Sequence, residues 1–160
     1  MYSVNAPVPP EVSRLARGLA AELIDATPRD RHTLVIKRLG EGDPQTLTHQ
    51  VRDAIVGTEP FQVRITGTDV FQNPITGHEP VVYLRVESPE LLSLHRRLCE
   101  RFGAIEQLEG DDYSPHVTIA RGGDADSLVG RDVDLEWTID SLFVWAARYD
   151  EPAERISLPA

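Results

Sequence analysis

The segment Tyr113–Arg121 combines a histidine and a threonine at a spacing that could serve one reaction centre. Pro115 favours an extended backbone before it, and the β-branched residues after it predict a short strand. Side chains alternate between the two faces of a strand, so we expect His116 and Thr118 to share one face. Two strand residues rise about 6.6 Å, which lets an imidazole and a hydroxyl reach one anion of phosphate size.

A second segment that begins with a histidine, His32–Gly40, lies upstream and is predicted to form another strand. The two histidines are 84 residues apart (116 − 32), about half of the chain. This separation is expected if each histidine begins an equivalent strand in two similar lobes.

These two segments resemble the signature of the 2H phosphoesterase superfamily, the RNA 2′,3′-cyclic phosphodiesterases also called 2′-5′ RNA ligases. The family is defined by two motifs of the form His-x-(Thr/Ser)-x, with x usually apolar. His116-Val117-Thr118-Ile119 fits this pattern fully, whereas the segment from His32 fits it in part. The resemblance implies an α+β fold of two pseudo-symmetric lobes, each an antiparallel sheet backed by helices, with the motifs facing across a central cleft.

The resemblance also implies roles for individual residues. His32 and His116 would be the acid–base pair that opens a 2′,3′-cyclic phosphate to a 2′-phosphate without a metal or cofactor, and Thr118 would hydrogen-bond the phosphate. Imidazole, with an ordinary pKa near about 6.5, can act as acid or base near neutral pH. The sequence leaves open which histidine is the acid, and whether the chain also joins 2′-5′ ends in the reverse direction.

The first motif departs from the family pattern, because Leu34 occupies the position two residues after His32. In a regular strand Thr33 points to the opposite face from His32. A bulge between His32 and Thr33 could return the hydroxyl to the site. Alternatively Lys37, which is the only lysine in the chain, or Arg38 could contact the phosphate.

Two residues that flank the second motif are further candidate substrate contacts. Arg121 follows His116 by five residues and falls on the opposite face of a regular strand, but it could turn toward the phosphate where the strand ends. Tyr113 could stack on a base, as aromatic side chains do in single-stranded RNA recognition, or pack in the interior.

The rest of the chain predicts a single domain over residues 1–160. Asp43-Pro44 and Ser88-Pro89 are expected to begin helices. We expect helices over about 10–27, 44–56 and 89–102, strands over 1–6, 32–40, 61–67 and 81–86 and from 116, and a sheet completed by 135–149. Strands and helices in this order favour an α+β arrangement.

The chain has 26 acidic and 16 basic residues, a net charge of −10. This charge repels polynucleotides, so we do not expect long RNA as a partner. The resemblance implies RNA ends or small cyclic-phosphate nucleotides as partners. The acidic, lysine-poor composition resembles that of proteins from high-salt cytoplasm; an ordinary acidic surface is the alternative. One cysteine, no signal peptide and no membrane-spanning stretch predict a cytoplasmic protein without membrane partners, which we expect to be a monomer.

Two other functions fit the same residues. One is hydrolysis of another small cyclic phosphate, such as an ADP-ribose cyclic phosphate. The other is a nucleotide- or RNA-end-binding module that has lost turnover, which the imperfect first motif favours.

Overall fold

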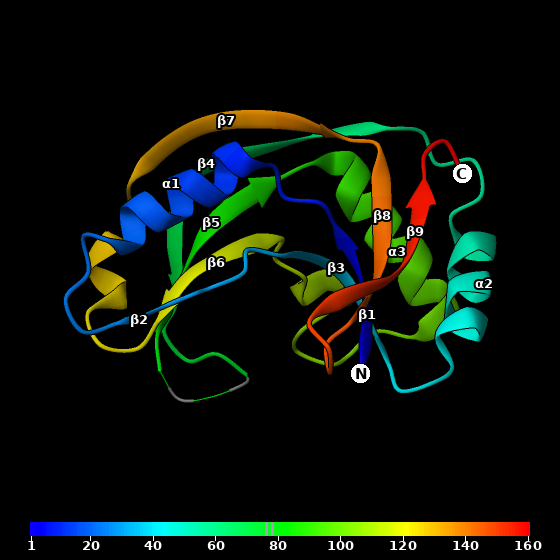
Figure 1. The fold of residues 1–160 in the computed structure, drawn as a ribbon, viewed down its shortest axis with the longest axis horizontal. Helices are drawn as coiled ribbons and strands as arrows, with labels where there is room; N and C mark the ends of the chain where they lie inside the picture. The colour runs from blue at the N-terminus through cyan, green and yellow to red at the C-terminus, as the bar shows by residue number, and fades with distance from the viewer. Residues whose placement is uncertain (76, 78) are drawn as a thin grey trace.

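The computed structural model describes residues 1–75, 77 and 79–160 (Figure 1). Its helices are α1 (Pro10–Ala20), α2 (Pro44–Ala54) and α3 (Pro89–Phe102), with short 3₁₀ turns η1 (Gly110–Asp112) and η2 (Ala125–Leu128). Its strands are β1 (Tyr2–Ala6), β2 (Thr27–Pro28), β3 (Leu34–Gly40), β4 (Phe61–Phe71), β5 (Val81–Glu87), β6 (His116–Arg121), β7 (Asp132–Ile139), β8 (Ser141–Ala146) and β9 (Glu151–Ser157). The described part of the chain contains no helix long and apolar enough to cross a membrane.

The strands form a sheet in the order β7-β4-β5-β6-β3-β1-β8-β9, and β2 pairs with β6. Neighbours in this order run antiparallel. The expected α+β fold is therefore confirmed, with four strands of this order on each side of the β6–β3 junction. At that junction Leu34 pairs with Val117, so the two histidine segments meet at the centre of the sheet.

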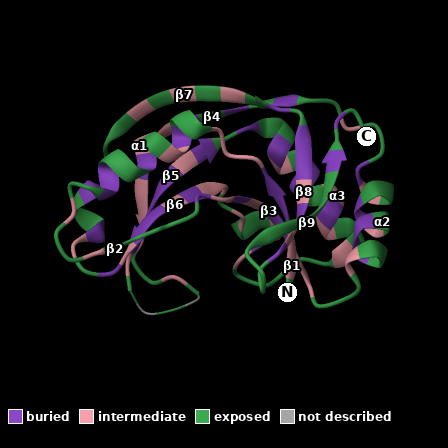
Figure 2. Ribbon diagram, viewed as in Figure 1, coloured by how far each residue is buried: buried purple, intermediate pink, exposed green. Residues whose placement is uncertain are grey.

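The core lies between this sheet and its helices. Helix α1 packs against β6 and helix α3 against β3. Figure 2 shows buried residues concentrated along β5, β6 and β8, whereas β7 is mostly exposed or half-buried. The central strands contribute these buried apolar residues: Val4, Ala6, Leu34, Val82, Leu84, Val117 and Ile119. Burial of each Val, Leu or Ile side chain in this set contributes roughly 1.5–3 kcal/mol. Side chains alternate between the two faces of a strand. His116 and Thr118 therefore lie on the face of β6 opposite to the buried Val117 and Ile119.

The predicted helix starts are confirmed by their capping hydrogen bonds. Asp43 Oδ2 accepts the backbone N–H of Thr46 at 2.9 Å, and Ser88 Oγ accepts that of Leu91 at 3.2 Å. Each cap satisfies an otherwise unpaired donor of the first helical turn.

Several predicted elements differ from the structure. Helix α1 ends at Ala20 rather than near Thr27, because the following segment is held in a loop by the Asp124 carboxylate, which accepts the backbone N–H of Ile24 and of Ala26. Strand β3 begins at Leu34 instead of at residue 32, and strand β9 was not predicted.

The late start of β3 reflects a bulge before it. Arg29 donates its backbone N–H to Ile119 at 2.9 Å, and the next pair is Leu34 with Val117. Four residues, 30–33, therefore lie opposite the single residue Thr118. The sequence anticipated a bulge here, and the structure places it over a longer segment.

Candidate active site

His116 lies at the start of β6 on the face away from the core. Its ring contacts Phe71 and Tyr83, with centroid separations of 5.1 and 5.2 Å. Its Nδ1 lies 2.7 Å from the carbonyl oxygen of Ser114. Because a carbonyl only accepts, this hydrogen bond assigns the proton to Nδ1 and leaves Nε2 as the basic nitrogen.

Burial lowers the pKa of His116, and the charges of Arg38 and Arg29 lower it further, while the hydrogen bond to Ser114 acts in the opposite direction. The imidazole is therefore neutral near neutral pH. A neutral imidazole with a free Nε2 can take a proton from a nucleophile.

Two threonine hydroxyls share this region of the sheet. Thr118 follows His116 by two residues on β6, and Thr33 lies just before β3. Neither hydroxyl forms a hydrogen bond with any part of the chain that the structure describes, so both are available to a ligand. Phosphate binding by these two residues stays a prediction.

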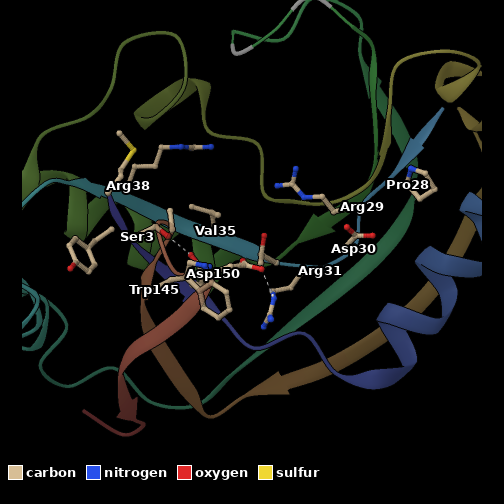
Figure 3. Close-up of a pocket in the computed structure, with 14 residues that line it drawn as sticks. Ser3, Pro28, Arg29, Asp30, Arg31, Val35, Arg38, Trp145 and Asp150 are labelled. Atoms are coloured by element: carbon tan, nitrogen blue, oxygen red, sulfur yellow. Dashed lines mark hydrogen bonds and ion pairs between the residues drawn. The ribbon is translucent and has the colours of Figure 1, made fainter.

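Arg29 and Arg38 lie close enough to His116 for their charges to act on its ring. Figure 3 shows the two guanidinium groups pointing toward one another. Among residues 1–75, 77 and 79–160, neither arginine has an acidic partner within ion-pair distance. In a chain with a net charge of −10, two guanidinium groups without an acidic partner among the described residues give this region a local positive charge.

The structure corrects the expectation that Lys37 contacts phosphate. Lys37 is only 1% exposed, and its Nζ lies 2.6 Å from Glu109 Oε1. The pairing of β1 with β3 shifts by one residue between Val4 and Asn5, which turns Lys37 toward the interior and Arg38 toward the open face. Arg38 was the alternative to Lys37, and it is the one that lies near His116.

A pocket of about 440 Å³ adjoins this region (Figure 3). Its lining residues come from the N-terminal strand, the bulge, β3 and the end of β8: Met1, Tyr2, Ser3, Asn5, Pro28, Arg29, Asp30, Arg31, Thr33, Val35, Arg38, Trp145, Ala147 and Asp150. Continuation of the Leu34–Val117 pairing places Val35 of this lining opposite His116. Neither His116 nor Thr118 is among the lining residues, so the pocket begins beside the His116 region and extends across β3 and β1.

His32 does not take the expected place opposite His116. Its two neighbours, Arg31 and Thr33, line the pocket, whereas His32 is 9% exposed and is absent from that lining. Loss of solvent lowers the pKa of His32, followed by the charges of Arg17 and Arg29; Arg17 belongs to helix α1, which packs behind the sheet. Because successive side chains alternate, a bulge that turns Thr33 to the pocket turns His32 away from it.

The environment of His32 is that of a packed residue. Its Nδ1 is buried and has no hydrogen-bond partner among the described residues. No ring contact joins it to His116 within the same residues. A catalytic role for His32 therefore rests on the family motif, and the geometry does not support it.

Tyr113 also differs from expectation. Its ring stacks on His95 with a centroid separation of 3.8 Å, and its hydroxyl donates to the carbonyl oxygen of Val35 at 2.7 Å. Burial raises the pKa of Tyr113. These contacts make it a packing residue that ties the loop before His116 to β3, and not a free platform for a base.

Arg121 lies at the end of β6, paired with Thr27 and Val81. Its Nη1 would be 2.7 Å from a Cβ built on Gly77, so the guanidinium lies against the turn between β4 and β5. Arg121 is not among the described residues that line the pocket. A contact between Arg121 and phosphate stays a prediction.

Sequence reasoning missed four residues of this site. Arg29 and Arg31 were not predicted as contacts, although two arginines before a histidine motif could have suggested an anion site. Asn5 and Trp145 carried no local signal, because they join the site only through the pairing of β1 with β3 and β8.

The α+β fold, with the His116 motif at the centre of its sheet, agrees with the two-lobed phosphoesterase class that the motif predicts. Residues 9–151 match the model of the 2′-5′ RNA ligase superfamily. The chain belongs to this superfamily.

Individual relatives agree with this assignment. The chain is 40% identical over 84 residues to the RNA 2′,3′-cyclic phosphodiesterase of Methanothermobacter thermautotrophicus, a match that spans 52% of this chain and 45% of that relative. E. coli LigT in complex with NADP+ has a TM-score of 0.71 at 14% identity, over 99% of this chain and 97% of LigT. A Thermus thermophilus crystal structure has a TM-score of 0.66 at 22% identity, over 98% and 97% of the two chains. The two structural likenesses establish the fold.

Proposed function

We propose that this protein is a metal-independent phosphodiesterase that hydrolyses 2′,3′-cyclic phosphates at RNA or nucleotide ends to 2′-phosphates. Membership of the 2′-5′ RNA ligase superfamily and the name of the archaeal relative support this reaction. The observation that carries the proposal is the neutral imidazole of His116 near the charges of Arg29 and Arg38, which have no acidic partner among the described residues.

These residues supply binding and proton transfer to a cyclic phosphate. Arg29 and Arg38 attract its anionic oxygens, and the hydroxyls of Thr33 and Thr118 donate hydrogen bonds as charge builds up in the transition state. His116 Nε2 takes a proton from the attacking water while the new P–O bond forms. The bond between phosphorus and the 3′-oxygen breaks, and the departing oxygen takes a proton from solvent, which leaves a 2′-phosphate and a 3′-hydroxyl.

The substrate is a short end or a small nucleotide. A pocket of about 440 Å³ lies in the usual range of small-molecule sites, roughly 300–1,000 Å³. The net charge of −10 opposes the binding of a long polyanion. An ADP-ribose cyclic phosphate satisfies the same limits and belongs in the substrate test. Joining of 2′-5′ ends is the reverse of the proposed chemistry.

A second candidate function is recognition of the same phosphate ends without turnover. The burial of His32 favours it, because His32 then does not supply a second imidazole to the site.

Incubation of the purified protein with 2′,3′-cyclic AMP in EDTA, at low and at molar salt, separates these two functions. We expect 2′-AMP as the product and its loss in His116→Ala. Tight binding without product would support the binding module, and a requirement for added metal would contradict the proposed mechanism.

A further inference from the structure

We infer that the part of the pocket formed by Asn5, Arg31 and Trp145 is a nucleoside subsite, which holds the base and ribose of a nucleotide whose phosphate lies at His116. This inference rests on the proposed function and adds the group that the protein recognises beyond the phosphate. Three independent features of the pocket support it.

The first feature is a buried amide with unused donors. Asn5 is 3% exposed and lines the pocket. Its Oδ1 accepts the hydroxyl of Ser3 at 2.8 Å, which fixes the orientation of the amide. The Nδ2 group forms no hydrogen bond with the described residues. Nδ2 is not among the fully buried unpaired atoms of the described residues, so it reaches the open pocket, where its N–H groups can donate to an acceptor on a ligand, such as a base edge or a ribose oxygen.

The second feature is a flat, fixed surface. The Nε of Arg31 lies 3.0 Å from Asp150 Oδ2, and the guanidinium carbon lies 5.3 Å from the centre of the Trp145 ring. Figure 3 shows the three side chains clustered together in the pocket. The ion pair and the ring hold the guanidinium in place, and nucleobases stack on both guanidinium planes and aromatic rings.

The third feature is the separation of charges within the pocket. Arg31 is neutralised by Asp150, whereas Arg29 and Arg38, which act on His116, have no ion-pair partner among the described residues. The part of the pocket near His116 therefore suits an anion, and the part near Trp145 suits an uncharged planar group. A nucleoside phosphate has these two parts in this order.

The test compares the affinity for 2′-AMP with the affinity for inorganic phosphate, both measured by calorimetry. We expect Arg31→Ala and Trp145→Ala each to lower the preference for 2′-AMP over phosphate by about tenfold, because stacking on a base is lost. Arg64→Ala is a matched control, since Arg64 is also an exposed arginine whose Nε lies 3.0 Å from a carboxylate, that of Asp134, and it lies outside the pocket. The control should leave this preference unchanged.

Tryptophan fluorescence gives a second measurement that does not require removal of the Arg31 or Trp145 side chain. The chain has two tryptophans, so Trp137→Phe leaves Trp145 as the reporter. We expect 2′-AMP, and not phosphate, to quench its emission.

The outcomes distinguish the two proposals. Equal loss of affinity for both ligands in Arg31→Ala and Trp145→Ala, or no quenching by bound 2′-AMP, would overturn the nucleoside subsite alone. Failure of the wild-type protein to bind either ligand would overturn the proposed function and the subsite with it.

Discussion

The ammonium group of Lys37 lies 2.6 Å from Glu109 Oε1, while Glu109 Oε2 accepts the backbone N–H of Arg38 at 2.9 Å. Both side chains of the ion pair are buried, Glu109 with an exposed fraction of 4%. Burial works to raise the pKa of Glu109, but hydrogen bonds from Lys37 and from the backbone of Arg38 and Ile105 hold this pKa below its usual range. The pair ties the loop before His116 to strand β3 and fixes the backbone of Arg38.

Glu109→Gln should therefore destabilise the protein. The substitution leaves the charge of Lys37 buried without a counter-charge, and loss of one partner of a buried pair costs about 3–5 kcal/mol. Urea denaturation measures the free energy of unfolding. The double variant Lys37→Met with Glu109→Leu should recover part of the loss, because no charge then remains buried. An unchanged unfolding free energy in Glu109→Gln would show that the pair is not needed.

His116→Ala should lower kcat for 2′,3′-cyclic AMP by about 10²- to 10⁴-fold, the usual contribution of one general base. The measurement is the initial rate of 2′-AMP formation at saturating substrate. His49→Ala is a suitable control, because His49 is an exposed histidine on helix α2. A loss of less than tenfold in His116→Ala would mean that another group takes the proton.

His32→Leu should retain activity and stability. The ring is buried with an unpaired Nδ1, so an apolar side chain of similar size removes an unsatisfied polar atom at little cost. We expect kcat within a few-fold of wild type and an unchanged or higher Tm, measured by steady-state kinetics and thermal unfolding. A loss of kcat near that of His116→Ala, with the fold intact, would restore His32 to the acid–base pair of the family motif.

Arg38→Ala should change both binding and pH dependence. Loss of a phosphate contact raises KM, and loss of its positive charge raises the pKa of His116, which burial and the charges of Arg38 and Arg29 now lower. Because the neutral ring is the base, activity falls as the pH drops through this pKa. The acid limb of the wild-type profile should therefore lie below about pH 6.5, the ordinary histidine pKa, and shift upward in Arg38→Ala. Arg38→Lys should return the acid limb of the pH profile to its wild-type position. An acid limb that does not shift in Arg38→Ala would show that the charge of Arg38 does not affect the pKa of His116.

The stability of the protein should fall in mild acid because of His95. Its Nδ1 lies 2.7 Å from the carbonyl oxygen of Ile36, and its Nε2 accepts the backbone N–H of Gly110 at 2.9 Å, which fixes the neutral ring. Burial lowers the pKa of His95, against the hydrogen bond to Ile36 and the charge of Glu109. Below the unfolded-state pKa, near about 6.5, the unfolded chain binds more protons than the folded one, so stability decreases as the pH falls through this value.

Urea denaturation at about pH 7.5 and about pH 5.5 measures this effect. His95→Gln should reduce the difference between the two pH values, since glutamine does not titrate. An equal difference in wild type and His95→Gln would assign the acid sensitivity to other groups.

Local pattern was enough to predict the parts of the fold that depend on neighbouring residues. The caps at Asp43 and Ser88 follow from side chains that bond within one helical turn. The alternation along β6 placed His116 and Thr118 away from the buried Val117 and Ile119 because a strand has a period of two.

The same alternation failed along β3, where pairing with distant strands breaks the period. A bulge before Leu34 and a shift opposite Val4 decide which face each of Thr33, Lys37 and Arg38 occupies. A one-residue shift exchanges the two faces of a strand, so the outcome depends on partners that lie far away in the chain.

The sequence by itself therefore determined the α+β class, the family motif around His116 and the acid–base chemistry that an imidazole can perform near neutral pH. Only the tertiary structure decided that His32 is packed away, that Lys37 is paired with Glu109, and that residues as distant as Asn5 and Trp145 line one pocket. The physical reason is that hydrogen-bonding periodicity is a local property of the backbone, whereas strand register and pocket composition are set by packing between segments far apart in the chain.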